Sequence, residues 1–221
     1  MKTSNELSRF DFGKFVAVPV FTLVLMWNFV GTSLSMKYLF PMDATKVLGF
    51  VNRLLTAAFL ALVIYLYFRR SSAIATTRSS LARFIAVFAF ILPFVIPFLG
   101  NAARTGPVML AISNAVMAAG LAFALAALCA LGKSFSIIPQ TRNLVVQGPY
   151  RLVRHPIYVG EIIQYFGLVL ASVSIPKALV VLLLIVCQVY RSIQEEKLLT
   201  DTFPEYLHYA SKTARFLPGL F

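Results

Sequence analysis

Long apolar stretches dominate the pattern of hydrophobic and polar positions along the chain. A run of about 20 apolar residues is long enough to cross the hydrocarbon core of a bilayer. Such stretches lie at 15–36, 47–68, 81–99, 108–131, 156–173 and 175–190. The last two are short and only Ser174 separates them, so they predict a tight helical hairpin. The pattern therefore predicts an all-α integral membrane protein with about six transmembrane helices.

The two ends of the chain are more polar than the stretches between them. Mixed polar and charged residues precede the first stretch, and no small-residue cleavage site follows a short apolar core. We therefore expect a retained first helix and no cleavable signal peptide. Near the other end, Phe203, Leu207, Ala210 and Ala214 recur at helical spacing. This spacing predicts an amphipathic C-terminal cytoplasmic helix at the membrane interface.

The distribution of basic residues predicts the topology of the chain, which has 221 residues and a net charge of +12. With the N-terminus in the cytoplasm, 15 of the 20 Lys and Arg residues fall on the cytoplasmic side. These are Lys2, Arg9, Lys14, Arg69, Arg70, Arg78, Arg83, Lys133, Arg142, Arg151, Arg154, Arg191, Lys197, Lys212 and Arg215. The opposite side holds Lys37, Lys46, Arg53, Arg104 and Lys177. Since basic residues are enriched in cytoplasmic loops, both termini are expected there. The membrane would be the inner membrane of a bacterium or the endoplasmic reticulum of a eukaryote.

The same composition argues against several classes of partner. The positive charges lie on short loops beside the predicted spans, so an anionic lipid surface explains them more simply than a nucleic acid does. The sequence has two cysteines, both inside apolar stretches, and two histidines. Neither a disulfide framework nor a multi-histidine metal site is expected. The expected partner is the lipid bilayer, and the oligomeric state is left open.

Candidate chemistry begins with the run GPYRLVRHPIYVG at 148–160. Pro156 suits the first position of a helix, with His155 at its cap. The free backbone N–H groups of that first turn form a site for a carboxylate or phosphate. The two arginines of the run add positive potential, and its two tyrosines offer flat surfaces to an aromatic base or a lipid. The alternative is an interfacial anchor, in which Arg and Tyr mark the headgroup level.

Acidic residues are scarce, and Glu195 and Glu196 form an adjacent pair near the end of the last predicted membrane helix. Arg191 lies four residues before Glu195, on the same helical face. A solvated helix end with one ion pair would account for these residues. A carboxylate at a helix C-terminus opposes the macrodipole, however, which favours a ligand for the pair. In a hairpin the pair would neighbour residues 148–160, and together they would suit a ligand with a carboxylate, an aromatic base, hydroxyls and an amine.

These motifs resemble those of the integral-membrane isoprenylcysteine carboxyl methyltransferases and their phospholipid N-methyltransferase relatives. The shared pattern has an L-V pair, a G-x-Y step, R-H-P-x-Y-x-G, E-E-x-x-L and an F-x-x-Y tail. The matching residues are Leu144, Val145, Gly148, Tyr150, Arg154, His155, Pro156, Tyr158, Gly160, Glu195, Glu196, Leu199, Phe203 and Tyr206. The resemblance extends over residues 131–209, and one departure is Pro204, where the family often has glycine.

The resemblance implies S-adenosyl-L-methionine as the methyl donor. The residues implied to bind it are Arg142, Asn143, Leu144, Val145, Tyr150, Arg154, His155, Pro156, Tyr158, Gly160, Glu195 and Glu196. No metal is implied. Residues 131–221 would then form the catalytic methyltransferase region with its cofactor site. Residues 1–130 would form structural membrane helices that could admit the acceptor.

Arg191 and Glu161 are the candidate catalytic residues. Arg191 occupies the place of an arginine that the carboxyl methyltransferases use for the acceptor, which favours the carboxylate of an isoprenylcysteine-type substrate. An ionised carboxylate needs no general base, so the protein would position it and exclude water. A phosphatidylethanolamine-type amine would need a base, for which Glu161 is the spare group. Glu161 would otherwise be a carboxylate favoured by its helix N-terminus.

Other acceptors and other classes remain open from the residues alone. A small thiol is a further acceptor. An NADPH-dependent sterol or isoprenoid reductase has a similar C-terminal region, but the two glutamates would repel a nucleotide phosphate. A non-catalytic lipid-binding, scaffold or transport protein is the third class, and charged residues deep in the spans, which an ion path would need, are lacking.

Overall fold

The computed structural model describes residues 12–37, 40–99 and 105–219. Lys2, Arg9 and Arg104, which the topology argument uses, lie outside the described residues. The α-helices are α1 Phe12–Lys37, α2 Ala44–Arg69, α3 Ser80–Ile91, α4 Pro107–Leu131, α5 Pro156–Ala171, α6 Ile175–Thr202 and α7 Tyr206–Lys212. The shorter elements are the 3₁₀ helices η2 Leu92–Phe98, η3 Gly132–Ser134 and η4 Gly148–Arg151, and the strands β1 Ala75–Thr76 and β2 Gln140–Thr141.

The described part of the chain is an all-α bundle, and four of its helices are long and apolar enough to cross a membrane. These segments are Ala17–Lys37, Ala44–Arg69, Pro107–Ser134 and Ile175–Thr202. Two shorter apolar helical segments, Ser80–Ile96 and Pro156–Ala171, accompany them. The expected all-α membrane protein is therefore confirmed, while the count of six spans stays a prediction.

The third predicted span is not one continuous α-helix. The α-helix α3 ends at Ile91, and the 3₁₀ helix η2 continues from Leu92 to Phe98. Pro93 explains the change, because a proline removes one backbone donor and its ring clashes with the carbonyl four residues before it. In contrast, the sixth stretch extends well past its apolar part, since α6 continues to Thr202. Glu195 and Glu196 therefore lie within α6.

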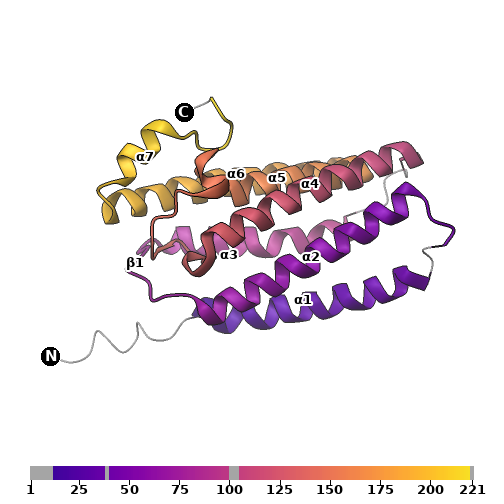
Figure 1. Ribbon diagram of the computed structural model, residues 1–221, viewed down its shortest axis with the longest axis horizontal. Helices are drawn as coiled ribbons and strands as arrows, with labels where there is room; N and C mark the ends of the chain where they lie inside the picture. Colours follow the sequence, from indigo (N-terminus) through magenta and orange to yellow (C-terminus); the bar gives the residue numbers. More distant parts are fainter. Residues whose placement is uncertain (1–11, 38–39, 100–104, 220–221) are drawn as a thin grey trace.

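Helices α5 and α6 are joined by residues 172–174, yet the most extensive packing of α5 is against α4. Small residues make this approach possible. A Cβ atom added to Gly160 would lie 2.6 Å from the carbonyl oxygen of Gly120, and a Cβ added to Gly167 would lie 2.9 Å from that of Ser113. Close backbone approach through glycine is the common way for membrane helices to associate. Figure 1 shows α4, α5 and α6 running side by side, with α2 and then α1 below them in this view.

The loops that carry the motifs gather at one end of this bundle, where β1 and α7 also lie (Figure 1). Strands β1 and β2 pair antiparallel, with Ala75 opposite Thr141. This small sheet connects the loop after α2 to the loop after α4. Beyond α7 the chain turns back, and Ala214 forms a parallel bridge with Val153. Segments distant in sequence thus meet beside the first turn of α5.

The C-terminal helix is present but shorter than the predicted apolar stripe. Helix α7 covers only Tyr206–Lys212, so Phe203 precedes it and Ala214 follows it. Within α7, Leu207 is exposed and Tyr206 is buried. The buried side of α7 is therefore set by contacts with the motif loops, which helical spacing within the tail could not indicate.

Candidate functional site

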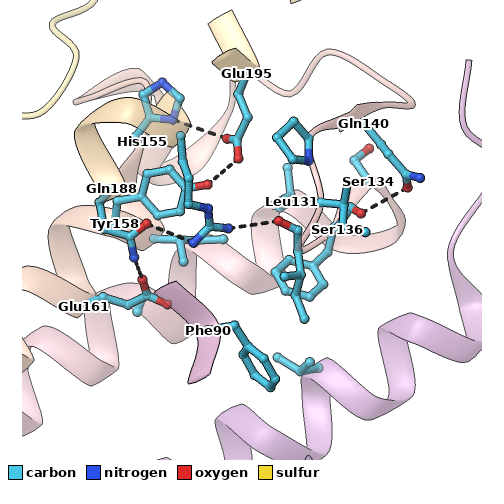
Figure 2. Close-up of a pocket in the computed structure, with 18 of the residues that line it drawn as sticks. Phe90, Leu131, Ser134, Ser136, Gln140, His155, Tyr158, Glu161, Gln188 and Glu195 are labelled. Atoms are coloured by element: carbon cyan, nitrogen blue, oxygen red, sulfur yellow. Dashed lines mark hydrogen bonds and ion pairs between the residues drawn. The ribbon is translucent and has the colours of Figure 1, made fainter. Parts of the chain in front are cut away.

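A cavity of about 280 Å³ lies where the motif loops meet the helices. This volume is close to the lower end of small-molecule sites, which run from about 300 Å³ upward. Figure 2 shows polar side chains from α5 and α6 on one side of the cavity and Phe90 of α3 below them. The cavity therefore has a polar compartment and an apolar compartment, and it draws residues from both halves of the chain.

The polar compartment is centred on Glu195 of α6. One carboxylate oxygen of Glu195 accepts a hydrogen bond from the hydroxyl of Tyr158 on α5. Its other oxygen lies 3.8 Å from Nδ1 of His155. The rings of His155 and Tyr158 are stacked, with centroids 5.5 Å apart and planes inclined by 2°. The predicted neighbourhood of the 148–160 run and the glutamates is thus present in the structure (Figure 2).

Beneath Tyr158, a chain of hydrogen bonds connects α6 to α5. Nη1 of Arg191 donates to Oε1 of Gln188 at 2.9 Å, and Nε2 of Gln188 donates to Glu161. Arg191 also donates from Nη2 to the carbonyl of Ile137 at 3.1 Å. Its guanidinium carbon lies 4.8 Å from the centroid of the Tyr158 ring. The two candidate catalytic residues are therefore connected through one side chain and share the cavity wall.

Gln188 is a member of this chain that the sequence analysis did not single out. It is 1% exposed and lines the cavity. The available signal was an amide inside an otherwise apolar stretch, because polar side chains within membrane helices are costly and tend to be functional.

Arg142 is the polar anchor of the loop that follows α4. Its Nε donates to the carbonyl of Ser71 at 2.7 Å, and its Nη2 donates to Gln140 at 2.8 Å. Nη1 is buried and has no hydrogen-bond partner among the described residues. Burial lowers the pKa of Arg142 from its ordinary value. Arg142 therefore joins the two loops of the β1–β2 sheet and leaves one buried N–H group at the cavity.

The remaining predicted site residues separate into two groups. Those that line the cavity, in addition to Arg142, Glu195, Glu161 and Arg191, are Asn143, Leu144, Val145, Tyr150, Arg154, His155 and Tyr158. Pro156, Gly160 and Glu196 do not belong to the lining found in the described residues. Pro156 is fully buried at the start of α5, and Gly160 packs on Gly120.

Glu196 faces away from the cavity, toward the C-terminal tail. It forms a two-pronged ion pair with Arg215, with distances of 2.9 Å from Nε to Oε1 and 2.7 Å from Nη2 to Oε2. Its Oε1 also lies 3.0 Å from Nε2 of His155 and 3.1 Å from Nε of Arg154. These hydrogen bonds to Glu196 raise the pKa of Arg215. Glu195 thus faces the cavity, whereas Glu196 binds the C-terminal tail.

The C-terminal tail contributes two tyrosines that the motif reading did not treat as site residues. Tyr206 and Tyr209 both line the cavity. The hydroxyl of Tyr209 donates to the carbonyl of Tyr150 at 2.6 Å, and burial raises the pKa of Tyr209 to about 12. Because the hydroxyl stays protonated at neutral pH, this bond holds α7 against η4.

The chemistry of the site is that of polar recognition beside an apolar chamber. Among the described residues, no group of three or more His, Cys, Asp or Glu side chains is placed to hold a metal ion. The polar compartment combines buried guanidinium N–H groups, the carboxylates of Glu195 and Glu161, and aromatic faces.

The comparisons with known proteins are matches of sequence to a family model and to two relatives. Residues 106–206 match the family model of the phospholipid methyltransferases. The cobalt-zinc-cadmium resistance protein CzcN of Cupriavidus metallidurans is 35% identical over 83 residues, and the nickel-cobalt-cadmium resistance protein NccN of Alcaligenes xylosoxydans xylosoxydans is 38% identical over 84 residues. Each of these alignments spans 37% of this chain and 38% of the relative. The resemblance drawn from the motifs is confirmed for residues 106–206, which match the phospholipid methyltransferase family model over less than half of the chain.

Proposed function

We propose that this protein is an S-adenosylmethionine-dependent methyltransferase of the membrane, acting on a lipid-like acceptor. The observation that carries the proposal is the continuity of the cavity. One space joins the polar compartment at Glu195 to an apolar compartment formed by the membrane helices. The family match over residues 106–206 supports the reaction class.

The residues of the polar compartment fit the methyl donor. Nη1 of Arg142 is a buried N–H group with no hydrogen-bond partner among the described residues, and its side chain lines the cavity. It suits the carboxylate of the donor. Glu195 suits an ammonium or hydroxyl group, and the rings of Tyr150, Tyr158 and Tyr209 suit an aromatic base. When bound, S-adenosylmethionine supplies an electrophilic methyl group on a sulfonium.

The apolar compartment fits a hydrocarbon chain. Its walls come from α1, α2, α3 and η2 through Phe21, Phe59, Leu60, Val63, Phe90 and Phe94. A hydrocarbon chain could pass from the bilayer between these helices, while the polar ligand enters at the loop end. Burial of apolar surface from water contributes roughly 25 cal/mol per Å². The protein would thus hold two ligands of opposite polarity in one water-poor space.

A carboxylate is the acceptor group that Arg191 supports best. Its two Nη groups donate to neutral oxygens, those of Gln188 and Ile137. No carboxylate among the described residues forms an ion pair with it within 4.0 Å. A buried guanidinium without a bonded counter-ion favours an anionic ligand. The lead acceptor is therefore the carboxylate of an isoprenylcysteine-type substrate.

Glu161 supports a second acceptor, the amine of a phosphatidylethanolamine-type lipid. Glu161 lines the cavity and accepts one hydrogen bond from Gln188. An ammonium group must lose a proton before it can attack the methyl group, and a nearby carboxylate can accept that proton. Arg191 would then face the phosphate of the headgroup.

The orientation proposed for the protein places the motif loops in the cytoplasm. Basic residues of the loops after α2 and α4 lie at the same end of the bundle as the tail (Figure 1). These positive charges favour the cytoplasmic face and its anionic lipids. Both termini are therefore proposed to be cytoplasmic.

The deciding experiment supplies the purified protein with methyl-labelled S-adenosylmethionine and two acceptors in separate detergent assays. The acceptors are a farnesylated N-acetylcysteine and phosphatidylethanolamine. Carboxyl methylation predicts label in the first assay, released by mild base as methanol, and little effect of Glu161→Gln. Amine methylation predicts base-stable label in the second assay, lost in Glu161→Gln. Label in neither acceptor would contradict the proposed acceptor classes.

A further inference from the structure

The contact between Glu196 and His155 joins a residue outside the cavity lining to a residue within it. Glu196 is outside the cavity lining, and its two oxygens are occupied by Arg215, His155 and Arg154. His155 has its two ring nitrogens in different environments. Nε2 faces Glu196 at 3.0 Å, and Nδ1 faces the cavity residue Glu195 at 3.8 Å.

The partners of Glu196 determine which ring nitrogen carries the proton. A carboxylate paired with two guanidinium groups is ionised and can only accept hydrogen bonds. In a neutral imidazole, Nε2 of His155 must therefore be the N–H nitrogen. Nδ1 is then an acceptor, so its lone pair and the Oε2 atom of Glu195 face each other. The remaining oxygen of Glu195 is already bonded to the hydroxyl of Tyr158.

Two acceptors that face each other at the wall of a cavity require a donor. A ligand hydroxyl or ammonium group placed between Nδ1 and Glu195 would bond to both. We propose that Glu196 is a positioning residue that fixes the Nε2–H tautomer of His155, so that Nδ1 and Glu195 together receive a hydroxyl or ammonium donor of the methyl-donor ligand. The proposal rests on the proposed function, because it assigns a role toward that ligand.

The tail supports the same arrangement from the other side of the ring. Backbone N–H groups of Arg154 and His155 donate to the carbonyls of Ala214 and Arg215, at 2.8 and 3.2 Å. The ring of Phe216 lies 5.8 Å from that of His155. The charged groups around the imidazole are thus Glu195 and Glu196 of α6, Arg154 beside it, and Arg215 of the tail. The imidazole thus lies between Glu196 at Nε2 and Glu195 at Nδ1.

The chain allows a direct spectroscopic test, because His208 is the second of only two histidines and is exposed. In His208→Gln protein labelled with ¹⁵N-histidine, both ring signals belong to His155. The expected ligand-free spectrum at neutral pH has a protonated Nε2 and an unprotonated Nδ1. Adding S-adenosylhomocysteine should shift the Nδ1 signal toward the hydrogen-bonded range. A protonated Nδ1 in the ligand-free protein, in a neutral or a doubly protonated ring, would overturn the proposal without any further variant.

Two variants and one shorter ligand complete the test. Glu196→Gln should lose the single tautomer and weaken S-adenosylhomocysteine binding by about tenfold or more. Glu195→Gln should weaken binding but keep the Nε2–H tautomer. Methylthioadenosine has the ribose hydroxyls but no ammonium, so a shift of Nδ1 with it identifies a hydroxyl, and a shift with S-adenosylhomocysteine alone identifies the ammonium.

The outcomes separate this proposal from the proposed function. Binding of S-adenosylhomocysteine with no response at Nδ1, or with an unchanged tautomer and affinity in Glu196→Gln, would overturn the role of Glu196 and leave the methyltransferase function standing. A correct tautomer with no binding of either ligand would overturn the proposed function, and with it the ligand that this inference assigns.

Discussion

Gly120 of α4 and Gly160 of α5 lie so close that a Cβ atom added to either would come within 2.6 Å of the other's carbonyl oxygen. This reciprocal contact holds the first turns of α5, which carry Tyr158, against α4. The family motif ends in Gly160, and the structure gives a physical reason for a glycine there. Gly160 packs on α4 and lies outside the cavity lining of the described residues.

Replacing Gly160 with alanine should therefore destabilise the fold. The added methyl group must displace backbone atoms of α4, and overpacking of this kind typically costs about 1–3 kcal/mol. The measurement is the midpoint of thermal unfolding in detergent. Gly49→Ala is the matched control, because a Cβ there meets nothing within 4 Å. A Gly160→Ala protein as stable as Gly49→Ala would show that the close contact is wrong.

Arg191→Lys should separate acceptor binding from donor binding. Lysine keeps the charge but cannot reproduce the fork that bonds Gln188 and Ile137. We expect kcat/KM for the acceptor to fall by about 100-fold, in line with a lost charged hydrogen bond of roughly 2–3 kcal/mol. Because Arg191 is assigned to the acceptor, the affinity for S-adenosylhomocysteine should change by less than about threefold.

The exposed residue Lys197, also on α6, offers the control Lys197→Arg, which should leave both quantities unchanged. If Arg191→Lys lost donor affinity and kept acceptor kinetics, the assignment of Arg191 to the acceptor would be wrong.

Arg142→Lys should weaken donor binding. The side chain has donors to Ser71 and Gln140 and one buried N–H left for a ligand. Lysine cannot supply all three directions, so the affinity for S-adenosylhomocysteine should fall by about tenfold or more. Calorimetry measures this, with Arg151→Lys as a control at an exposed position. Equal affinities in the two variants would remove Arg142 from the donor site.

Ala89→Leu should shorten the acceptor that the protein accepts. Ala89 is buried on α3 and lines the apolar compartment. The larger side chain reduces the space for a hydrocarbon tail, so activity should shift toward acceptors with shorter chains. Ala61→Leu is a control on the exposed face of α2. The comparison is a series of acceptors of increasing chain length. An unchanged chain-length preference in Ala89→Leu would place the tail elsewhere.

The sequence was sufficient to predict the helical membrane fold and the meeting of its motifs. Apolar length identifies α1, α2, α4 and α6 directly, because crossing a bilayer requires it. Only Ser174 separates the fifth and sixth apolar stretches, so a hairpin was expected to bring the start of one helix beside the end of the other. His155 and Glu195 were therefore expected to be neighbours. The third stretch was harder, because Pro93 and Pro97 interrupt a run that length alone assigns to one helix.

Contacts made by the tail could not be predicted in the same way. Arg215 pairs with Glu196, and Tyr209 bonds to Tyr150, only because the chain reverses after α7. No periodicity in the sequence encodes that reversal. Glu195 and Glu196 form one motif in the sequence, yet adjacent helical positions point in different directions, and only the packing of the tail assigns one to the cavity and the other to Arg215.

The most direct test of the central claim is calorimetric titration of S-adenosylhomocysteine into the purified protein in detergent. The wild type should bind saturably, Glu195→Gln should lose about tenfold or more in affinity, and the exposed control Asp201→Asn should bind like the wild type. Folded wild-type protein that binds neither S-adenosylhomocysteine nor S-adenosylmethionine would contradict the methyltransferase account.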